Sequence, residues 1–469
     1  SWRDTLGLLW RIAVAAILTA FLIKPLNIMS LGDTQAESAG IPVKKIRLLS
    51  LAVAAFLSAG VVGFVGMMGF VGLAAATLVR QMGVRTLSMR LICSFIVGAL
   101  LLMLTDNGLM LLKHYRGTDL PAGAVTALVG APLLLWLTAK APPRPSFQTT
   151  SDISTAAPHV PRLLRFLLLI AVAVSVLAFT VGRYDETLRL TIDPEYFVFR
   201  YPRVLLAAAT GTMLALTGVI LQRLTQNPMA GPELLGISSG TAFGAMSVVM
   251  LFGITSGSGW FWLTGIVSAL VSLGLLMLFN RKNGFTPEKI LLTGMALAAL
   301  ADAAIRIWMA TGDFRVQLLL LWMSGSTYQA TPESALTVGL LAAASLLLIL
   351  TLQRWLGLLS LNATIARSVG INIPLARLVL IVSSAALTAL STLLIGPLSF
   401  VGLLAPHLAR MLGARLPKQQ LAAAALIGAS VMMTADWLGR QVMFPYEVPA
   451  GMMATLIGGA YFMMMMRKL

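Results

Sequence analysis

Residues 66–85 read GMMGFVGLAAATLVRQMGVR, and residues 396–415 read GPLSFVGLLAPHLARMLGAR. Their shared letters keep a constant offset, because residues 66 and 396, 72 and 402, and 83 and 413 are each 330 positions apart. A second matched pair, SLGDTQAESAGIPV at 30–43 and SLNATIARSVGINIP at 360–374, has the same offset. A fixed spacing over such a length indicates two copies of one structural unit, joined head to tail.

The two copies differ in how much of the unit they contain. We assign residues 162–469 to a complete second unit and residues 1–139 to the C-terminal part of a first unit. Ser1 corresponds to Thr331 at this offset, so we expect the N-terminal half of the first unit to be absent from this sequence. Between them, residues 140–161 read KAPPRPSFQTTSDISTAAPHVP, a polar and proline-rich composition that predicts a cytoplasmic linker.

Both units are too apolar to fold in water. Of the 469 residues, 58% are hydrophobic and 11% are charged, whereas soluble domains carry about 25% charged residues. Apolar runs of about 20 residues are typical of membrane-spanning helices. We therefore predict an all-α, polytopic transmembrane bundle made of two parallel tandem repeats of a ten-helix unit, the first incomplete, with about 15 membrane segments in total. The runs lie at 5–23, 44–62, 70–80, 87–105 and 121–138 in the first unit, and at 163–181, 204–222, 233–253, 260–280, 288–309, 332–352, 375–395, 400–411, 418–437 and 449–466 in the second.

The net charge of +17 has two explanations, nucleic-acid binding or the excess of Lys and Arg in cytoplasmic loops. The basic residues stand in short clusters between apolar runs rather than in one patch, which favours the membrane explanation and no nucleic-acid partner. If the ten runs alternate in direction, these clusters share one side, which should be cytoplasmic, and residues 182–199, 310–331 and 438–448 form the outer loops. The clusters are Arg162/Arg165, Arg281/Lys282, Arg354/Arg367, Arg410/Arg415/Lys418 and Arg467/Lys468.

The sequence contains no motif of a catalytic or nucleotide-binding site. The patterns G-x-x-x-x-G-K-[ST], H-E-x-x-H, G-x-S-x-G and C-x-x-C are all absent. The single cysteine, Cys93, lies in an apolar run and is interpreted as a small buried hydrophobe, so disulfides and thiolate metal sites are excluded. His407 is interpreted as a packing residue. We therefore expect no enzyme activity and no metal site in this chain.

Two features of the second unit leave alternatives open. Asp302 and Arg306 are four residues apart inside an apolar run, and we expect a structural ion pair in preference to a direct role in transport. The methionine run 463–466 fits either a flexible lining for bulky apolar cargo or ordinary lipid-facing and core residues.

Several segments resemble the membrane subunits of the iron-siderophore and cobalamin ABC importers, and the resemblance covers both units. Within that family, the fusion of two units in one chain is a mark of the ferric-hydroxamate (ferrichrome) permeases. The segments that carry it are RYPR (200–203), LTQNPMAGPELLGISSG (224–240), ILLTGMAL (290–297), LWMSGS (321–326), SLNATIARSVGI (360–371), GPLSFVGLLAPHLAR (396–410) and VPAGMMATLIGG (448–459).

The resemblance implies three groups of functional residues. Cytoplasmic helices that couple to the ATPase correspond to 360–373, with Ala366, Arg367 and Gly370, and to Ala36, Glu37 and Gly40 in the first unit. Outer arginines that dock a binding protein through its carboxylates correspond to Arg200, Arg203 and Arg440. A cytoplasmic gate corresponds to Asn227, Met229 and Thr286. In the first unit Met110 stands where Arg440 would be.

The same resemblance implies an ATP-driven importer that carries ferric hydroxamate siderophores from periplasm to cytoplasm by alternating access. Its partners are two copies of a cytoplasmic ATPase, a periplasmic siderophore-binding protein, the cargo and the lipid of the bacterial inner membrane. ATP and Mg belong to the ATPase, so this chain itself needs no cofactor. Three alternatives make different predictions: an ion-coupled secondary transporter needs no ATPase, an intramembrane enzyme needs convergent polar residues at mid-depth, and a sensor or scaffold carries no flux.

Overall fold

The computed structural model describes residues 2–66, 68–116, 120–140, 159–184, 187–255, 258–283, 286–361 and 363–466. The chain divides into two compact units, residues 1–140 and 141–469. Ten of the described helices are long and apolar enough to cross a membrane, and further apolar helices of 10–17 residues accompany them. These spans confirm the predicted all-α, multi-pass class. A helix suits this environment because it satisfies its own backbone hydrogen bonds, which lipid cannot do.

Unit 1 contains six helices in its described part: α1 (Trp2–Met29), α2 (Asp33–Ser38), α3 (Val43–Val65), α4 (Val71–Gln81), α5 (Leu87–Arg116) and α6 (Ala122–Lys140). Helix α1 packs against α3, while α4 packs against both α5 and α6. Helix α4 has 11 residues, which is too short to cross a bilayer alone.

Unit 2 is built around α8 (Pro194–Thr225), which contacts α7, α13, α16, α17 and α18. It has one two-stranded antiparallel hairpin, β1 (Val181–Tyr184) with β2 (Thr187–Leu190), in its described part. Its other elements are α7 (Val160–Thr180), η1 (Pro232–Leu235), α9 (Ile237–Phe252), α10 (Gly259–Asn280), η2 (Arg281–Asn283), α11 (Pro287–Met309), α12 (Phe314–Met323), α13 (Pro332–Thr351), α14 (Gln353–Leu361), α15 (Ala363–Ser368), α16 (Ile373–Ile395), α17 (Val401–Met411), α18 (Pro417–Gln441) and α19 (Ala450–Met466).

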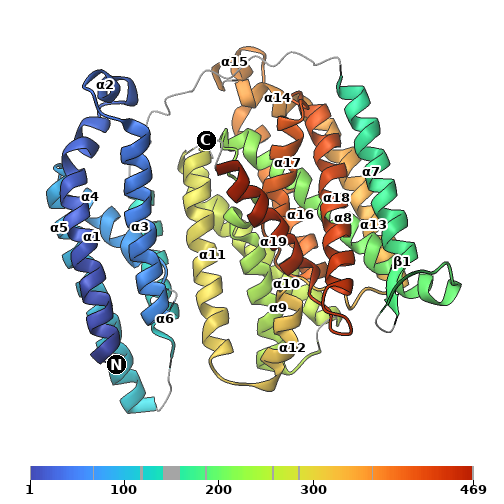
Figure 1. Cartoon of the computed structure of the whole chain (residues 1–469), viewed down its shortest axis with the longest axis horizontal. Helices are drawn as coiled ribbons and strands as arrows, with labels where there is room; N and C mark the ends of the chain where they lie inside the picture. The colour runs from blue at the N-terminus through green and yellow to red at the C-terminus, as the bar shows by residue number, and fades with distance from the viewer. Residues whose placement is uncertain are drawn as a thin grey trace. The chain divides into compact units, whose positions relative to one another are not determined.

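The two ends of unit 2 differ in what they carry. Helices α14 and α15 lie at one end, and the β1–β2 hairpin and α12 lie at the other (Figure 1). We call these the inner end and the outer end. Arg162 lies in the first turn of α7, and Arg281 directly follows α10. Both are at the inner end, where the charge pattern predicts the cytoplasm.

Three consecutive helices of unit 1 have counterparts in unit 2 at the offset of the sequence repeat. The bounds of α2, α3 and α4 are each 330 positions from those of α15, α16 and α17. Both short helices α4 and α17 also follow a phenylalanine with positive φ, Phe70 at 70° and Phe400 at 71°. A left-handed residue with a bulky side chain is uncommon, so the two segments share a local backbone geometry that ordinary helix ends do not have.

The structure differs from the sequence-based expectation in the outer segments. Residues 310–331 were predicted as a loop, but Phe314–Met323 forms α12, whose first turn is capped by Asp313 accepting from the Arg315 amide at 2.9 Å. Residues 182–199 were also predicted as a loop, but they contain the hairpin and the first turns of α8. These helical and strand elements are too short to give a clear periodic pattern, so the sequence did not reveal them.

Close helix packing in unit 2 depends on glycine. A Cβ at Gly218 of α8 would collide with the carbonyl oxygen of Gly402 in α17, and one at Gly211 with the carbonyl oxygen of Gly428 in α18. Small residues let helix backbones approach within membranes, where no hydrophobic effect drives helices together. These contacts bring the inner parts of α8, α17 and α18 close enough for their polar side chains to meet.

Candidate functional site

Each unit presents one short helix of the predicted coupling motif, and the two have the same C-terminal cap. In unit 2, Gly370 adopts φ 83° after α15, and Ile371 N–H donates to the Ala366 carbonyl at 3.1 Å. In unit 1, Gly40 adopts φ 79°, and Ile41 N–H donates to the Ala36 carbonyl at 3.0 Å. This pattern is a Schellman cap, which favours glycine at the left-handed position.

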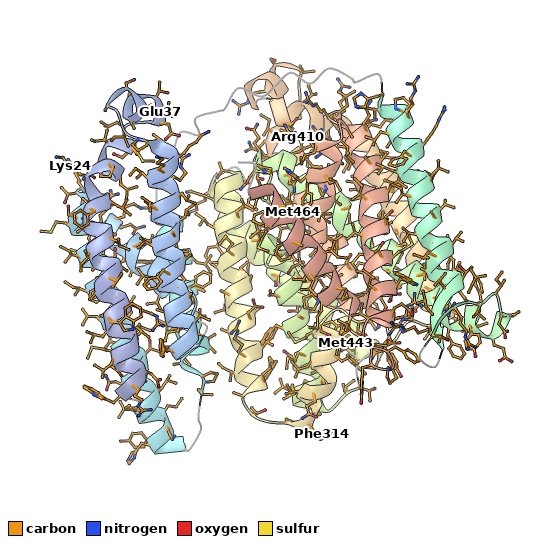
Figure 2. All side chains as sticks on the ribbon, in the orientation of Figure 1. Lys24, Glu37, Phe314, Arg410, Met443 and Met464 are labelled. Atoms are coloured by element: carbon orange, nitrogen blue, oxygen red, sulfur yellow. The ribbon has the colours of Figure 1, made fainter. Side chains whose placement is uncertain are left out.

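Side chains on the two predicted coupling helices differ in their exposure. Ala366 and Ala36 are fully buried, whereas Arg367 and Glu37 are exposed. Figure 2 shows Glu37 on α2 of unit 1. In the same unit, Arg47 of α3 pairs with Asp33 at 2.9 Å and holds the start of α2. In each unit the arrangement exposes a charged side chain, Glu37 or Arg367, next to a buried alanine on a short helix.

The predicted gate residues lie in two places at the inner side of unit 2. Gln226 ends α8 with φ 51°, and the Asn227 side-chain oxygen accepts a hydrogen bond from Met229 N–H at 2.9 Å. Thr286 is the N-cap residue of α11, and its buried hydroxyl has no hydrogen-bond partner in the described part of the chain. Asn227 and Met229 thus share one turn, while no hydrogen bond among the described residues joins that turn to the Thr286 side chain.

A polar network at the inner end of α8 was not predicted from the sequence. Arg223 Nε donates to the Gln420 side-chain oxygen at 2.6 Å, Nη1 donates to the Ser360 hydroxyl at 3.4 Å, and Nη2 donates to the Arg415 carbonyl. Gln226 Nε2 donates to the Ser360 carbonyl at 3.1 Å. These bonds connect the gate turn to α14, directly before the coupling helix, and to the α17–α18 connection. Arg223 lies at the end of an apolar run, where a basic residue is expected in any case, so no sequence signal distinguished it.

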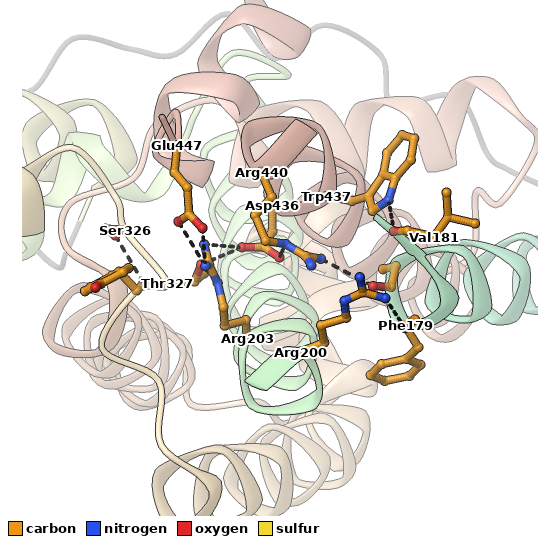
Figure 3. Close-up of polar contacts among 12 residues, drawn as sticks. Phe179, Val181, Arg200, Arg203, Ser326, Thr327, Asp436, Trp437, Arg440 and Glu447 are labelled. Atoms are coloured by element: carbon orange, nitrogen blue, oxygen red, sulfur yellow. Dashed lines mark hydrogen bonds and ion pairs between the residues drawn. The ribbon is translucent and has the colours of Figure 1, made fainter. Parts of the chain in front are cut away.

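The three predicted docking arginines meet at the outer end of unit 2, but they are largely buried (Figure 3). Arg200 is 8% exposed and donates to the Phe179 carbonyl at 2.8 Å. Arg440 pairs with Asp436 at 3.0 Å and donates to the Ala178 carbonyl at 3.4 Å. Their guanidinium groups therefore brace α7 against α8 and α18.

Arg203 is the arginine of this cluster that reaches a cavity. It pairs with Glu447 at 2.9 Å, lies 3.5 Å from Asp436 and donates to the Thr327 hydroxyl at 3.1 Å. Asp436 is 1% exposed and is the shared acceptor of the cluster. A cavity of about 350 Å³ opens beside Arg203 and Glu447 and is lined also by Ser326, Tyr328, Tyr446 and Pro449.

Asp302 and Arg306 do not form the predicted ion pair. Both are exposed on unit 2, and no N–O contact within 4.0 Å joins them in the part of α11 that the structure describes. The four-residue spacing puts both on one helix face, but an ion pair also requires that both rotamers turn toward each other. The rings of His407 and Tyr461 pack edge to face, with 6.4 Å between their centroids. In the methionine run, Met463 and Met464 are exposed, and the side chains of Met465 and Met466 lie outside the described residues.

No group of three or more His, Cys, Asp or Glu side chains that could hold a metal ion occurs within the described ranges. The predicted site residues lie at helix ends: each unit has one capped short helix, and unit 2 also has the braced turn at its inner end and the arginine cluster at its outer end.

Comparison with known proteins identifies the group to which this arrangement belongs. Residues 1–140 and 163–468 match the FecCD transport family. The whole chain is 39% identical to the iron(3+)-hydroxamate import system permease protein FhuB of Escherichia coli (strain K12), covering 70% of that protein, and 39% identical to its namesake in Salmonella typhimurium, covering 68%. It is 33% identical over 316 residues to the hemin transport system permease protein HmuU of Yersinia pestis, which covers 65% of this chain and 95% of HmuU.

A solved inward-facing structure of a metal-chelate type ABC transporter also aligns with this chain. The TM-score is 0.59 at 28% sequence identity, over 66% of this chain and 100% of that one. Both units match the same family, and the identity to two relatives extends over the full length of the chain. The chain belongs to the FecCD transport family.

Proposed function

We propose that this chain is the membrane-spanning permease of an ATP-driven importer, and that its cargo is a ferric hydroxamate siderophore. The observation that carries this proposal is the 39% identity, over all of the chain, to two permeases of iron(3+)-hydroxamate import systems. The chain is a multi-pass protein of the bacterial inner membrane, with its long apolar helices as spans. The two units are parallel copies of one repeat, which the matching bounds of α2–α4 and α15–α17 support.

ATP is bound and hydrolysed by partner subunits, and this chain supplies two docking helices for them. The exposed residues Arg367 and Glu37, each next to a buried alanine and a glycine cap, support one ATPase contact on each unit. ATP and Mg accordingly belong to the partner, and two copies of it bind.

Movement of a coupling helix is passed to the gate through Arg223 and Gln226. Both side chains bond to Ser360, which lies in the last turn of α14 directly before α15. A displacement of α15 therefore pulls on the inner end of α8 and on the turn that contains Asn227 and Met229. Thr286 contributes to the same gate from the start of α11.

The outer arginine cluster receives the periplasmic binding protein. Arg203 is the contact residue, because it lines the cavity and its partner Glu447 is partly exposed. A carboxylate of the binding protein can replace Glu447 on Arg203, since a guanidinium can hold two carboxylate oxygens at once. Arg200 and Arg440 keep the surrounding helices in place through their bonds to backbone carbonyls.

The test is uptake of labelled ferrichrome into proteoliposomes that contain the permease, its ATPase and its binding protein. We expect uptake only when ATP is inside and the binding protein is outside. Uptake driven by a proton gradient without ATP would contradict the proposal and indicate a secondary transporter. If the binding protein stimulates ATP hydrolysis but ferrichrome is not taken up, the importer assignment stands and the proposed cargo is wrong.

A further inference from the structure

The β1–β2 hairpin and the start of α8 form a projection at the outer end of unit 2, which we call the outer foot (residues 181–184 and 187–199). In the hairpin, Val181 pairs with Leu190 and Gly182 pairs with Arg189. Side chains alternate between the two faces of a strand and directly opposite residues share a face, so Val181, Arg183, Leu188 and Leu190 lie on one face and Gly182 and Arg189 on the other. The Gly182 face lies against the protein, because a Cβ there would collide with the Arg200 guanidinium.

The face that points away from the protein carries Arg183 and otherwise exposed apolar side chains. Leu188 is 54% exposed, Leu190 is 70% exposed and Ile192, which continues the alternation, is 80% exposed. Phe199, in the second turn of α8, is 77% exposed. So many contiguous exposed apolar side chains are unusual on a surface that faces water and indicate an interaction site.

Ring contacts and hydrogen bonds fix the outer foot to α7, α8 and α18. The ring of Phe197 lies 5.3 Å from that of Phe179 in α7 and 5.6 Å from that of Tyr201 in α8. Trp437 of α18 donates its indole N–H to the Val181 carbonyl at 3.0 Å, and the Gln441 side chain accepts from the Arg183 amide at 2.8 Å. These contacts within unit 2 therefore fix the orientation of the apolar face.

The length of α7 places the foot at the level of the lipid headgroups. A helix of 21 residues is about 31 Å long, close to the roughly 30 Å of hydrocarbon in a bilayer. Thr180 therefore reaches the outer boundary, and the hairpin that starts at Val181 leaves the hydrocarbon there. Figure 1 shows the hairpin directly beyond the end of α7.

Helix α7, which leads to the foot, also has an exposed apolar side. Leu169, Val172 and Val176 are all more than half exposed and are spaced three and four residues apart, so they share one side of the helix. Arg183 is exposed on the same face of the hairpin as Leu188 and Leu190, where a long basic side chain can reach phosphate groups while its stem stays apolar. Aromatic and basic residues around an apolar face are typical of segments that lie in a membrane interface.

We propose that the outer foot is a lipid-binding surface that lies in the outer headgroup region, with Leu190, Ile192 and Phe199 among the acyl chains and Arg183 at a lipid phosphate. The occupant is the phospholipid bilayer, because the foot begins where the membrane span α7 ends and because Leu188 and Leu190, on the outward face of its hairpin, are exposed and apolar. This surface anchors the outer ends of α7 and α8, which also carry Phe179 and Arg200 of the arginine cluster.

The test uses spin labels on the transporter in nanodiscs of phosphatidylethanolamine and phosphatidylglycerol. Cys93→Ser removes the only cysteine, and Ile192→Cys, Phe199→Cys and, as a control in the exposed α11–α12 connection, Thr311→Cys are then labelled in separate samples. We expect the labels at 192 and 199 to be more accessible to oxygen than to a water-soluble nickel complex, and the label at 311 to show the reverse.

Three other outcomes would overturn the proposal. Equal nickel access at 192, 199 and 311 would mean that the foot lies in water. Loss of both oxygen and nickel access when the binding protein is added would mean that the foot is a protein-docking surface. Low access to both reagents before any addition would mean that another part of the transporter covers it. As a second measurement, Arg183→Gln should shift the label at 199 toward greater nickel access, whereas Arg189→Gln, on the opposite face of the hairpin, should not. Equal values for the two variants would contradict the role of Arg183.

Discussion

At the scale of single residues, Arg223 contacts three segments that lie far from it in the sequence. Its guanidinium meets side chains or carbonyls of α14, α18 and the α17–α18 connection, at sequence distances of 137, 197 and 192 residues. A hydrogen bond to a charged group contributes about 1.5–3 kcal/mol, so the loss of this residue should weaken the link between the coupling helix and the gate.

We expect Arg223→Ala to lower ferrichrome uptake per ATP hydrolysed by about tenfold or more, corresponding to the loss of one charged hydrogen bond. ATP hydrolysis itself should continue, because the ATPase contacts are elsewhere, and Arg223→Lys should restore part of the uptake. Arg162→Ala, an exposed basic residue at the same end of unit 2, serves as control and should leave the ratio unchanged. Equal uptake-to-hydrolysis ratios for Arg223→Ala and the control would contradict this role.

Asp436 illustrates a buried charge with more than one partner. Arg440 and Arg203 lie 3.0 and 3.5 Å from it, and a neutral amide at this position would leave two guanidinium groups close together without a shared acceptor. Breaking a buried ion pair on one side costs about 3–5 kcal/mol. We therefore expect Asp436→Asn to lower the melting temperature of the detergent-solubilised permease clearly, and a melting temperature equal to that of wild type would show that the cluster is dispensable for stability.

Asp313 gives a prediction of pH dependence outside the membrane spans. Hydrogen bonds from Arg315 lower the pKa of this carboxyl from 3.8 to about 2. Since its pKa is lower in the folded state, its contribution to stability is complete above the unfolded pKa and is lost as the pH falls from about 4 through 2. The wild-type melting temperature should thus fall toward that of Asp313→Asn over this range, and a constant difference between the two would contradict the assignment.

At the scale of elements, the packing of α8 against α17 depends on Gly218. The carbonyl of Gly402 occupies the space that a Cβ would need, so an added methyl group must push two backbones apart. Overpacking of this kind costs about 1–3 kcal/mol. We expect Gly218→Ala to lower the melting temperature, whereas Gly274→Ala in α10, where a Cβ would meet nothing within 4 Å, should leave it unchanged or raise it. Equal effects of the two substitutions would mean that α8 and α17 can separate without loss.

The elements themselves were predictable to different degrees. Long spans such as α16 and α18 were evident because about 20 apolar residues in sequence have no other stable environment. The short helix before Gly370 was expected from the family resemblance of residues 360–371. Helix α12 and the β1–β2 hairpin were not expected, because elements of 10 and 4 residues are too short to give a clear periodic pattern.

At the scale of the whole molecule, each unit carries one short helix, α2 or α15, that we propose as a docking site for an ATPase subunit. Proline fixes φ near −65° and has no N–H, so it can neither adopt the positive φ of Gly40 or Gly370 nor donate to the Glu37 or Arg367 carbonyl. We expect Gly40→Pro and Gly370→Pro each to leave one ATPase subunit bound per permease, and the double variant to bind none. The measurement is the mass of the complex after co-purification, with Gly459→Ala, which has open space around it, as control. A double variant that retains two ATPase subunits would refute docking at these helices.

The sequence by itself determined the all-α, membrane-spanning class of this protein and predicted its repeat. Hydropathy, the 330-residue offset and the glycines at 40 and 370 are all properties of short stretches or of their order along the chain. Only the tertiary structure decided that Arg203, Thr327, Asp436 and Glu447 form one cluster, that Arg223 reaches Ser360, and that the outer foot exposes an apolar face. The physical reason is that spans are selected one by one by their transfer into lipid, whereas polar partners are selected by how helices pack, through contacts between residues more than 100 positions apart.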